Sequence, residues 1–112
     1  MKIPLVRINK ILQENFIQSP SLISINVEGW ELPILKTLDF SRWRPAVFCI
    51  ETVFFDKHSQ HKKNQNVISF TEKQNYFLYA DTFINSIFVD QNIWAEKRKV
   101  FKSILLVSSF NV

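Results

Sequence analysis

Two carboxylates stand at the ends of two segments that we predict to be β-strands. Glu28 follows the segment Leu22–Val27, and Glu51 is the last residue of the segment Ala46–Glu51. A carboxylate in such a position can act as a general base or bind a cation. Asn26 precedes Glu28 by two residues, and its amide forms hydrogen bonds but lacks charge and basicity. These residue types predict a polar site where the two strands end.

A turn and a helix must connect the two strands. Gly29 is the only glycine of the chain and lets the backbone turn sharply. Pro33 suits the first turn of a helix that begins near Trp30, because its missing N–H would have no partner there. The segment Ala46–Glu51 is apolar at successive positions, which is typical of a parallel strand covered from both sides.

Strand, crossover helix and strand together predict a βαβ unit, in which both strands end at the same sheet edge. Ligands bind beyond the carboxyl ends of the strands in open parallel sheets. The candidate site residues at this edge are Asn26, Glu28 and Glu51, and the helix N-terminus after Gly29 is a source of free N–H groups.

A purely structural role for the same acidic side chains is the alternative. Glu28 and Glu31 complement the positive end of the helix dipole, and both can cap the helix. Glu51 can pair with a nearby arginine, either Arg42 or Arg44. The residue types alone leave both interpretations open.

The remaining chain predicts supporting elements on both sides of this unit. Apolar spacing and turn residues predict a helix over Ile8–Asn15, a polar loop over Asp56–Asn66, a weak helix over Val67–Asn75, and an antiparallel hairpin of the strands Tyr76–Ala80 and Asn85–Asp90. The C-terminal pattern fits a helix over Trp94–Val107, with Val100, Phe101, Ile104 and Leu105 on one side, or a strand over Ile104–Val107.

Composition excludes several classes of binding site and partner. A chain of 112 residues with 46% hydrophobic residues forms one domain, and a single glycine excludes a glycine-rich phosphate loop. The net charge of +4 is spread along the chain, so we expect a basic surface and no nucleic-acid or membrane partner. Cys49 is the only cysteine, and we expect a buried thiol and a cytoplasmic protein. Asp56, His58 and His61 lack a fourth ligand, so we expect no metal site.

A family resemblance adds to this interpretation. The run ISINVEGWELPILKTL, followed by RPAVFCIE and later by YFLYADTFINSIFV, resembles the signature of the FkbM family of S-adenosylmethionine-dependent methyltransferases over about residues 4–90. Asn26 stands where the family carries an aspartate. The residues that match the family pattern are Glu28, Gly29, Glu31, Glu51 and Asn85.

The resemblance implies a Rossmann-like methyltransferase sheet with strand order 3-2-1-4-5-7-6, of which this chain supplies strands 4, 5, 6 and 7. It implies catalytic roles for Asn26, Glu28 and Glu51, a cofactor contact at Gly29, and substrate contacts at Glu31 and Asn85. The chain is then a single partial domain over residues 1–112, with residues 91–112 as a C-terminal extension.

The half of such a fold that binds the cofactor has no counterpart in this sequence. We therefore predict the C-terminal half of an O-methyltransferase, which binds no S-adenosylmethionine alone and whose acceptor is a hydroxyl of a small molecule or glycan. The alternative is a non-catalytic fragment that serves as an interaction module or is a gene remnant. In either case the unpaired edge of the first strand invites self-association or pairing with an N-terminal half.

Overall fold

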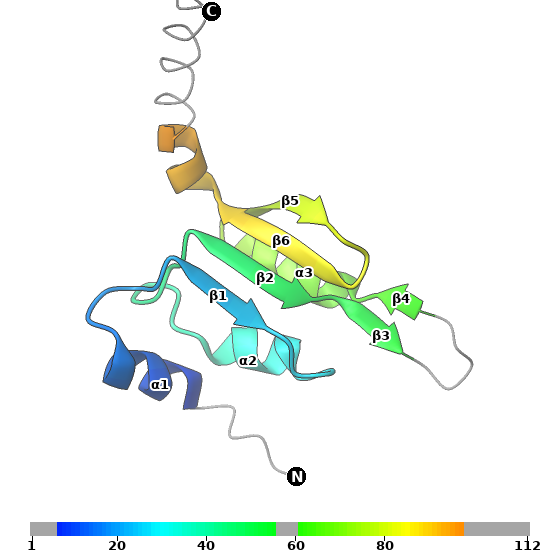
Figure 1. Ribbon diagram of the computed structural model, residues 1–112, viewed down its shortest axis with the longest axis horizontal. Coiled ribbons are helices and arrows are strands. Elements are labelled where there is room, and N and C mark those ends of the chain that lie inside the picture. Colours follow the sequence, from blue (N-terminus) through cyan, green and yellow to red (C-terminus); the bar gives the residue numbers. More distant parts are fainter. Residues whose placement is uncertain (1–6, 56–60, 98–112) are drawn as a thin grey trace, which may run out of the picture.

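The computed structural model describes residues 7–55 and 61–97, which form a mixed α/β fold (Figure 1). The elements in chain order are α1 (Arg7–Asn15), β1 (Leu22–Ile25), α2 (Glu31–Thr37), β2 (Val47–Glu51), β3 (Val53–Phe55), β4 (His61–Lys63), α3 (Gln65–Lys73), β5 (Tyr76–Asp81) and β6 (Asn85–Asp90). Residues 91–97 are helical and follow β6 directly. The main sheet has the strand order β1-β2-β6-β5, and β3 and β4 form a separate two-stranded sheet.

The predicted βαβ unit is confirmed. Strands β1 and β2 pair in parallel from Leu22 opposite Val47 to Ile25 opposite Ile50, and α2 lies between them in the chain. Strand β1 ends at Ile25, two residues before the predicted end at Val27. The backbone N–H of Val27 donates to the Glu31 side chain at 2.9 Å, so it takes no part in the pairing of the sheet.

The predicted hairpin is also confirmed. Strands β5 and β6 pair antiparallel, with a bulge between Leu78 and Ala80, and β6 pairs antiparallel with β2. Asn75 precedes β5 in the left-handed region, at φ 68°, where asparagine is among the better-tolerated residues after glycine. The same sheet therefore contains one parallel and two antiparallel strand pairs.

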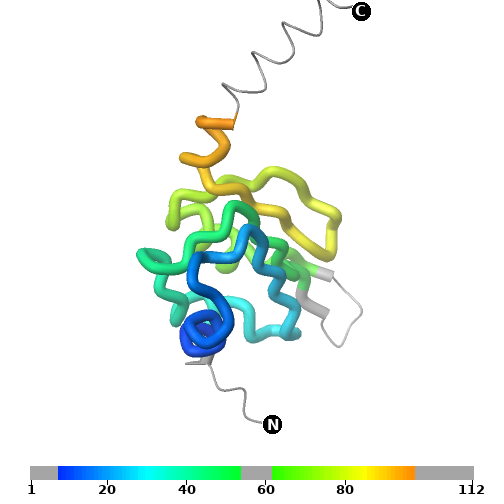
Figure 2. Tube along the Cα trace, turned by 60° about the vertical axis from the view of Figure 1, so that its left-hand side comes forward, coloured from blue at the N-terminus to red at the C-terminus, as the bar shows by residue number. Residues whose placement is uncertain are grey.

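One face of the sheet forms the core. Ile25, Phe48, Ile50 and Phe88 point to this face and are almost completely buried. They cluster with apolar side chains of α2 and α3, which lie on that side of the sheet (Figure 1). Helix α1 lies beside α2 in both views (Figure 1 and Figure 2) and is joined to it by a hydrogen bond from the Asn9 amide to the carbonyl of Thr37 at 2.7 Å.

The opposite face differs from the prediction. Val47 and Cys49 alternate with the buried residues of β2 and are only partly buried. Among the described residues, no helix covers this face, which is turned toward the viewer in Figure 1. The expectation that β2 is covered from both sides is therefore wrong for the described chain.

The polar segment after β2 was predicted as a loop, and that prediction is wrong at His61–Lys63. These residues form β4, in which Lys63 lies opposite Val53. The pairing of Lys63 with Val53 and the hydrogen bonds of its ammonium stabilise a strand here, although the segment is polar. Helix α3 then begins at Gln65, two residues earlier than predicted, because the Asn64 side chain accepts a hydrogen bond from the N–H of Val67.

The C-terminal prediction is tested only in part. The predicted helix over Trp94–Val107 agrees with the structure up to Lys97. Its remainder, and the alternative strand over Ile104–Val107, lie outside the described residues.

Candidate functional site

Strand register brings three of the predicted residues to one edge. Glu51 lies opposite Asn85 in the pairing of β2 with β6. Asn26 follows Ile25, whose partner Ile50 precedes Glu51, so Asn26 reaches the same edge from the other side. Neighbouring strands lie about 4.8 Å apart, so the row from Asn26 to Asn85 spans about 10 Å. This row, Asn26–Glu51–Asn85, is the polar edge of the sheet.

Glu51 is the most buried member of the polar edge. It is 8% exposed, yet its carboxylate forms no hydrogen bond or ion pair within residues 7–55 and 61–97. Burial raises the pKa of Glu51 above its ordinary value, and the nearby negative charges of Glu31 and Glu28 raise it further. The carboxylate oxygens of Glu51 still reach solvent, so this carboxyl with a raised pKa and no described partner is suited to receive a proton or a hydroxyl hydrogen bond.

The alternative of an arginine partner for Glu51 is wrong. Arg44 pairs with the buried carboxylate of Asp90, because its Nε donates to Oδ2 at 3.0 Å and its terminal nitrogen lies 2.9 Å from the same oxygen while donating to the carbonyl of Gln74. Arg42 donates to the backbone carbonyl of Ile17 and stacks over the ring of Trp43. Both arginines therefore serve other parts of the fold, and Glu51 keeps its charge uncompensated.

Glu31 and Gly29 build the turn that carries this edge. The carboxylate of Glu31 is 3% exposed and accepts the N–H groups of Val27 and Gly29, each at 2.9 Å. Gly29 has φ 97°, a conformation that strains any residue with a Cβ atom, and the preceding Glu28 has φ 46°. Glu31 lies in the first turn of α2 as expected, but α2 has no side-chain cap hydrogen bond, and the Glu31 carboxylate secures the turn before the helix instead.

The six predicted site residues therefore fall into two groups. The N–H of Gly29 and both oxygens of Glu31 are already engaged. The remaining four side chains form no hydrogen bond to any described residue, and they are Asn26, Glu28, Glu51 and Asn85. Only this second group is free to contact another molecule.

A lysine behind the polar edge was missed from the sequence. The ammonium of Lys63 donates to the hydroxyl of Thr52 at 2.6 Å, to Asp81 at 2.9 Å, to the carbonyl of Phe83 at 2.8 Å and to Ser86 at 3.3 Å. These contacts join the end of β2 to β4 and to the turn between β5 and β6. They position Glu51 and Asn85, which directly adjoin Thr52 and Ser86. No local pattern marks Lys63, because its partners are remote in sequence.

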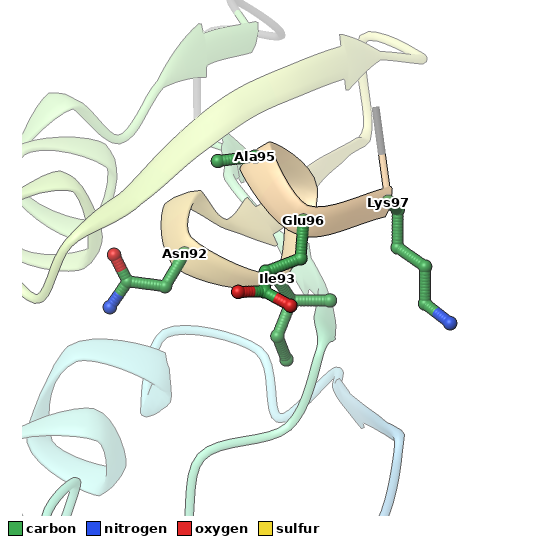
Figure 3. Close-up of a pocket in the computed structure, with 5 residues that line it drawn as sticks. All are labelled: Asn92, Ile93, Ala95, Glu96 and Lys97. Carbon is green, nitrogen blue, oxygen red and sulfur yellow. The ribbon is translucent and has the colours of Figure 1, made fainter. Parts of the chain in front are cut away.

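The site's charge and shape limit what it can bind. The carboxylates of Glu28, Glu31 and Glu51 lie close together and disfavour an anionic ligand. Within the described ranges, no cluster of His, Cys, Asp or Glu is arranged to hold a metal ion. A hollow lies elsewhere, beside the helix after β6 (Figure 3), and is lined by Asn92, Ile93, Ala95, Glu96 and Lys97.

A comparison with known families identifies the domain to which this edge belongs. The model of the methyltransferase FkbM domain matches residues 1–78, which include β1, α2, β2 and the turn with Gly29. The chain belongs to the FkbM methyltransferase domain family. Searches of curated proteins and of solved structures gave no match. In the part of the FkbM domain chain that the structure describes, no helix is long and apolar enough to span a membrane.

We expect Glu31→Gln to destabilise the protein by about 1–3 kcal/mol, since an amide cannot accept both the Val27 and the Gly29 N–H groups. Urea unfolding followed by circular dichroism measures this change. Glu28→Gln is the matched control, because that side chain is exposed and forms no hydrogen bond to a described residue. Equal stability of the two variants would contradict the role of Glu31.

Glu51→Gln should stabilise the protein at pH 7. The folded state holds the Glu51 proton more tightly than the unfolded state, so stability falls as pH rises from about 4.5 through the raised pKa. The amide removes this loss, and the melting temperature of the variant should exceed that of the wild type at pH 7 but not at pH 4. Thermal melts at both pH values test this, with the exposed Glu72→Gln as control. A gain that is independent of pH would show that charge is not the cause.

Proposed function

We propose that this chain forms the acceptor-binding half of an S-adenosylmethionine-dependent methyltransferase that transfers a methyl group to a hydroxyl. Family membership supports the reaction class. The observation that carries the assignment is Glu51, a residue only 8% exposed whose carboxylate still reaches solvent and has no described partner, in a row with Asn26 and Asn85. The acceptor that suits this edge is an uncharged or cationic molecule with a free hydroxyl, such as a small molecule or a glycan.

Each side chain of the polar edge has a proposed task. Glu51 accepts a hydrogen bond from the acceptor hydroxyl and takes its proton as the oxygen becomes methylated. Asn26 and Asn85 flank Glu51 and orient the acceptor through their amides, which can both donate and accept. Glu28 lies exposed at the rim, where its charge adds to the field that disfavours anions. Positioning of the acceptor is the main contribution required for such a transfer.

The observed strand order supports the proposed place in the full domain. The order β1-β2-β6-β5 corresponds to strands 4-5-7-6 of the methyltransferase sheet. S-adenosylmethionine supplies the methyl group in this family. The described residues do not fit that cofactor, because the only glycine of the chain has its N–H engaged by Glu31 and the surrounding edge is acidic. We therefore propose that the cofactor half comes from another polypeptide segment.

We also propose a cytoplasmic location, with neither nucleic acid nor a membrane as partner. The lone Cys49 needs no oxidising compartment. The net charge of +4 is distributed along the chain without a dense basic segment.

Isothermal titration calorimetry tests the division between the two halves. Titration of S-adenosylmethionine into the full chain should show no binding with a dissociation constant below about 1 mM. The same titration should show binding when the N-terminal half of an FkbM-domain methyltransferase is supplied as a separate polypeptide. A micromolar dissociation constant for the chain alone would contradict the proposal.

A second candidate function is that of an interaction module. Strand β1 is an edge of the sheet, and its only described partner is β2. The carbonyl of Ser21 accepts the N–H of Val47 at 3.0 Å, so the backbone groups of the alternate residues Leu22 and Ser24 face away from β2. Leu22, in this strand, is 57% exposed. A partner strand, from a second copy or from an N-terminal half, can pair there.

Ser24→Pro should weaken any self-association at this edge by about ten-fold or more, because it removes an outward N–H and leaves the β1–β2 hydrogen bonds intact. Ser24→Thr is the matched control and keeps that N–H. Sedimentation velocity over a range of concentrations measures the effect. A wild type that stays monomeric at high concentration would exclude self-association. Equal self-association of the two variants would mean that the contact lies on another surface.

A further inference from the structure

The sheet face that no described helix covers is strongly apolar. We call it the open face, and its side chains are Leu22, Val47, Cys49, Phe77, Ile87 and Val89. Strand register places four of these side chains next to one another across the sheet, in the order Leu22, Val47, Val89 and Phe77. We call these four residues the first row. The neighbouring residues Phe48 and Phe88 point to the other face and are completely buried.

An apolar face of this extent requires a cover. Contiguous apolar surface left in water is unfavourable, and in soluble proteins it marks a contact with something else. The residues of β2 are apolar on both faces, which is the pattern of a strand that is buried from both sides. Helices α2 and α3 cover only one of these two faces.

The Trp94 side chain already contacts one end of this face, although no described helix lies across it. The helix over residues 91–97 starts directly after β6, and the ring of Trp94 packs edge-on against Phe77 and Tyr79, with both centroid distances 5.6 Å. Asp90 fixes the start of this helix, since its carboxylate accepts the N–H groups of Asn92 and Ile93. The chain therefore leaves the sheet beside the first row of the open face.

The sequence that follows has the composition and length to continue this contact. Residues 98–112 include Val100, Phe101, Ile104 and Leu105, which recur at a spacing that gives one apolar stripe. Fifteen residues span about 22 Å as a helix, and four strands are about 14 Å across. A tethered segment also acts at a millimolar effective concentration, which favours it over a separate molecule.

We propose that residues 98–112 pack across the open face and bury the first row together with Cys49. This contact does not rest on the proposed enzymatic function, because it is argued from the apolar row and Cys49, while Glu51 and Asn85 lie farther along the same face, beyond Cys49 and Ile87. It gives β2 the second covering layer that its sequence requires.

Cys49 is a built-in probe for this contact. It is the only thiol of the chain, and it lies on the open face between Ser24 and Ile87. The rate at which a thiol reagent modifies Cys49 in the full chain reports whether the face is covered. We expect the rate for the native wild type to be at least about ten-fold below that for the urea-unfolded chain.

Two substitutions in the segment separate the apolar stripe from its polar side. Ile104→Asp should increase the modification rate of Cys49 by about ten-fold, because a carboxylate cannot be buried against the apolar row. Ser103→Asp introduces the same charge at the neighbouring position and should leave the rate within about two-fold of the wild type. Far-ultraviolet circular dichroism checks that each variant is folded, and Ile104→Ala replaces Ile104→Asp if that variant is not.

Three results would overturn the proposal. One is a native wild-type rate close to that of the unfolded chain, which would mean that the face is open in solution. Another is an equal rate for the Ile104 and Ser103 variants. The third is a wild-type rate that falls with increasing protein concentration, since a second copy would then be the cover.

Discussion

The buried carboxylate of Glu31 is the constraint on which the rest of this structure depends. By accepting the N–H groups of Val27 and Gly29 it ends β1 and holds the turn that leads into α2. It also places a negative charge beside Glu51, whose pKa is raised by burial and by this neighbour. The interaction that makes the turn therefore also tunes the group that we assign to the chemistry.

Lys63 holds the other end of the polar edge in a comparable way. Its ammonium contacts two hydroxyls, one carboxylate and one carbonyl, which come from the residue after β2, from β6, from the end of β5 and from the turn between β5 and β6. The contact with Lys63 also lowers the pKa of Asp81, chiefly through their hydrogen bond. The hydrogen bonds of Glu31 hold the turn on one side of Glu51 and Asn85. The hydrogen bonds of Lys63 hold the adjoining residues Thr52 and Ser86 on the other side. Such support limits the motion of side chains that must orient a substrate.

Two parts of the described structure lack the contacts that their chemistry calls for. Glu51 is largely buried and its carboxylate has no described partner, and the open face of the sheet has apolar side chains without a covering layer. A partly desolvated charge and an exposed apolar face are both unfavourable, so we infer that each contacts a further molecule or segment. The two differ in kind, because the first suits a polar acceptor and the second suits an apolar segment of the chain.

The amino-acid sequence by itself determined the βαβ unit, the hairpin of β5 and β6, the sharp turn at Gly29 and the family. These features depend on local patterns, namely alternating apolar residues, turn residues and a motif of short spacing. It also placed Asn26 and Glu51 at one edge, because parallel strands must end on the same side. Only the tertiary structure showed that Glu31 is engaged by the turn, that Arg44 serves Asp90 instead of Glu51, and that Lys63 lies in a strand behind the site. Each of these outcomes depends on which of several equivalent partners lies within hydrogen-bond distance, and that distance is decided by packing between residues remote in the chain.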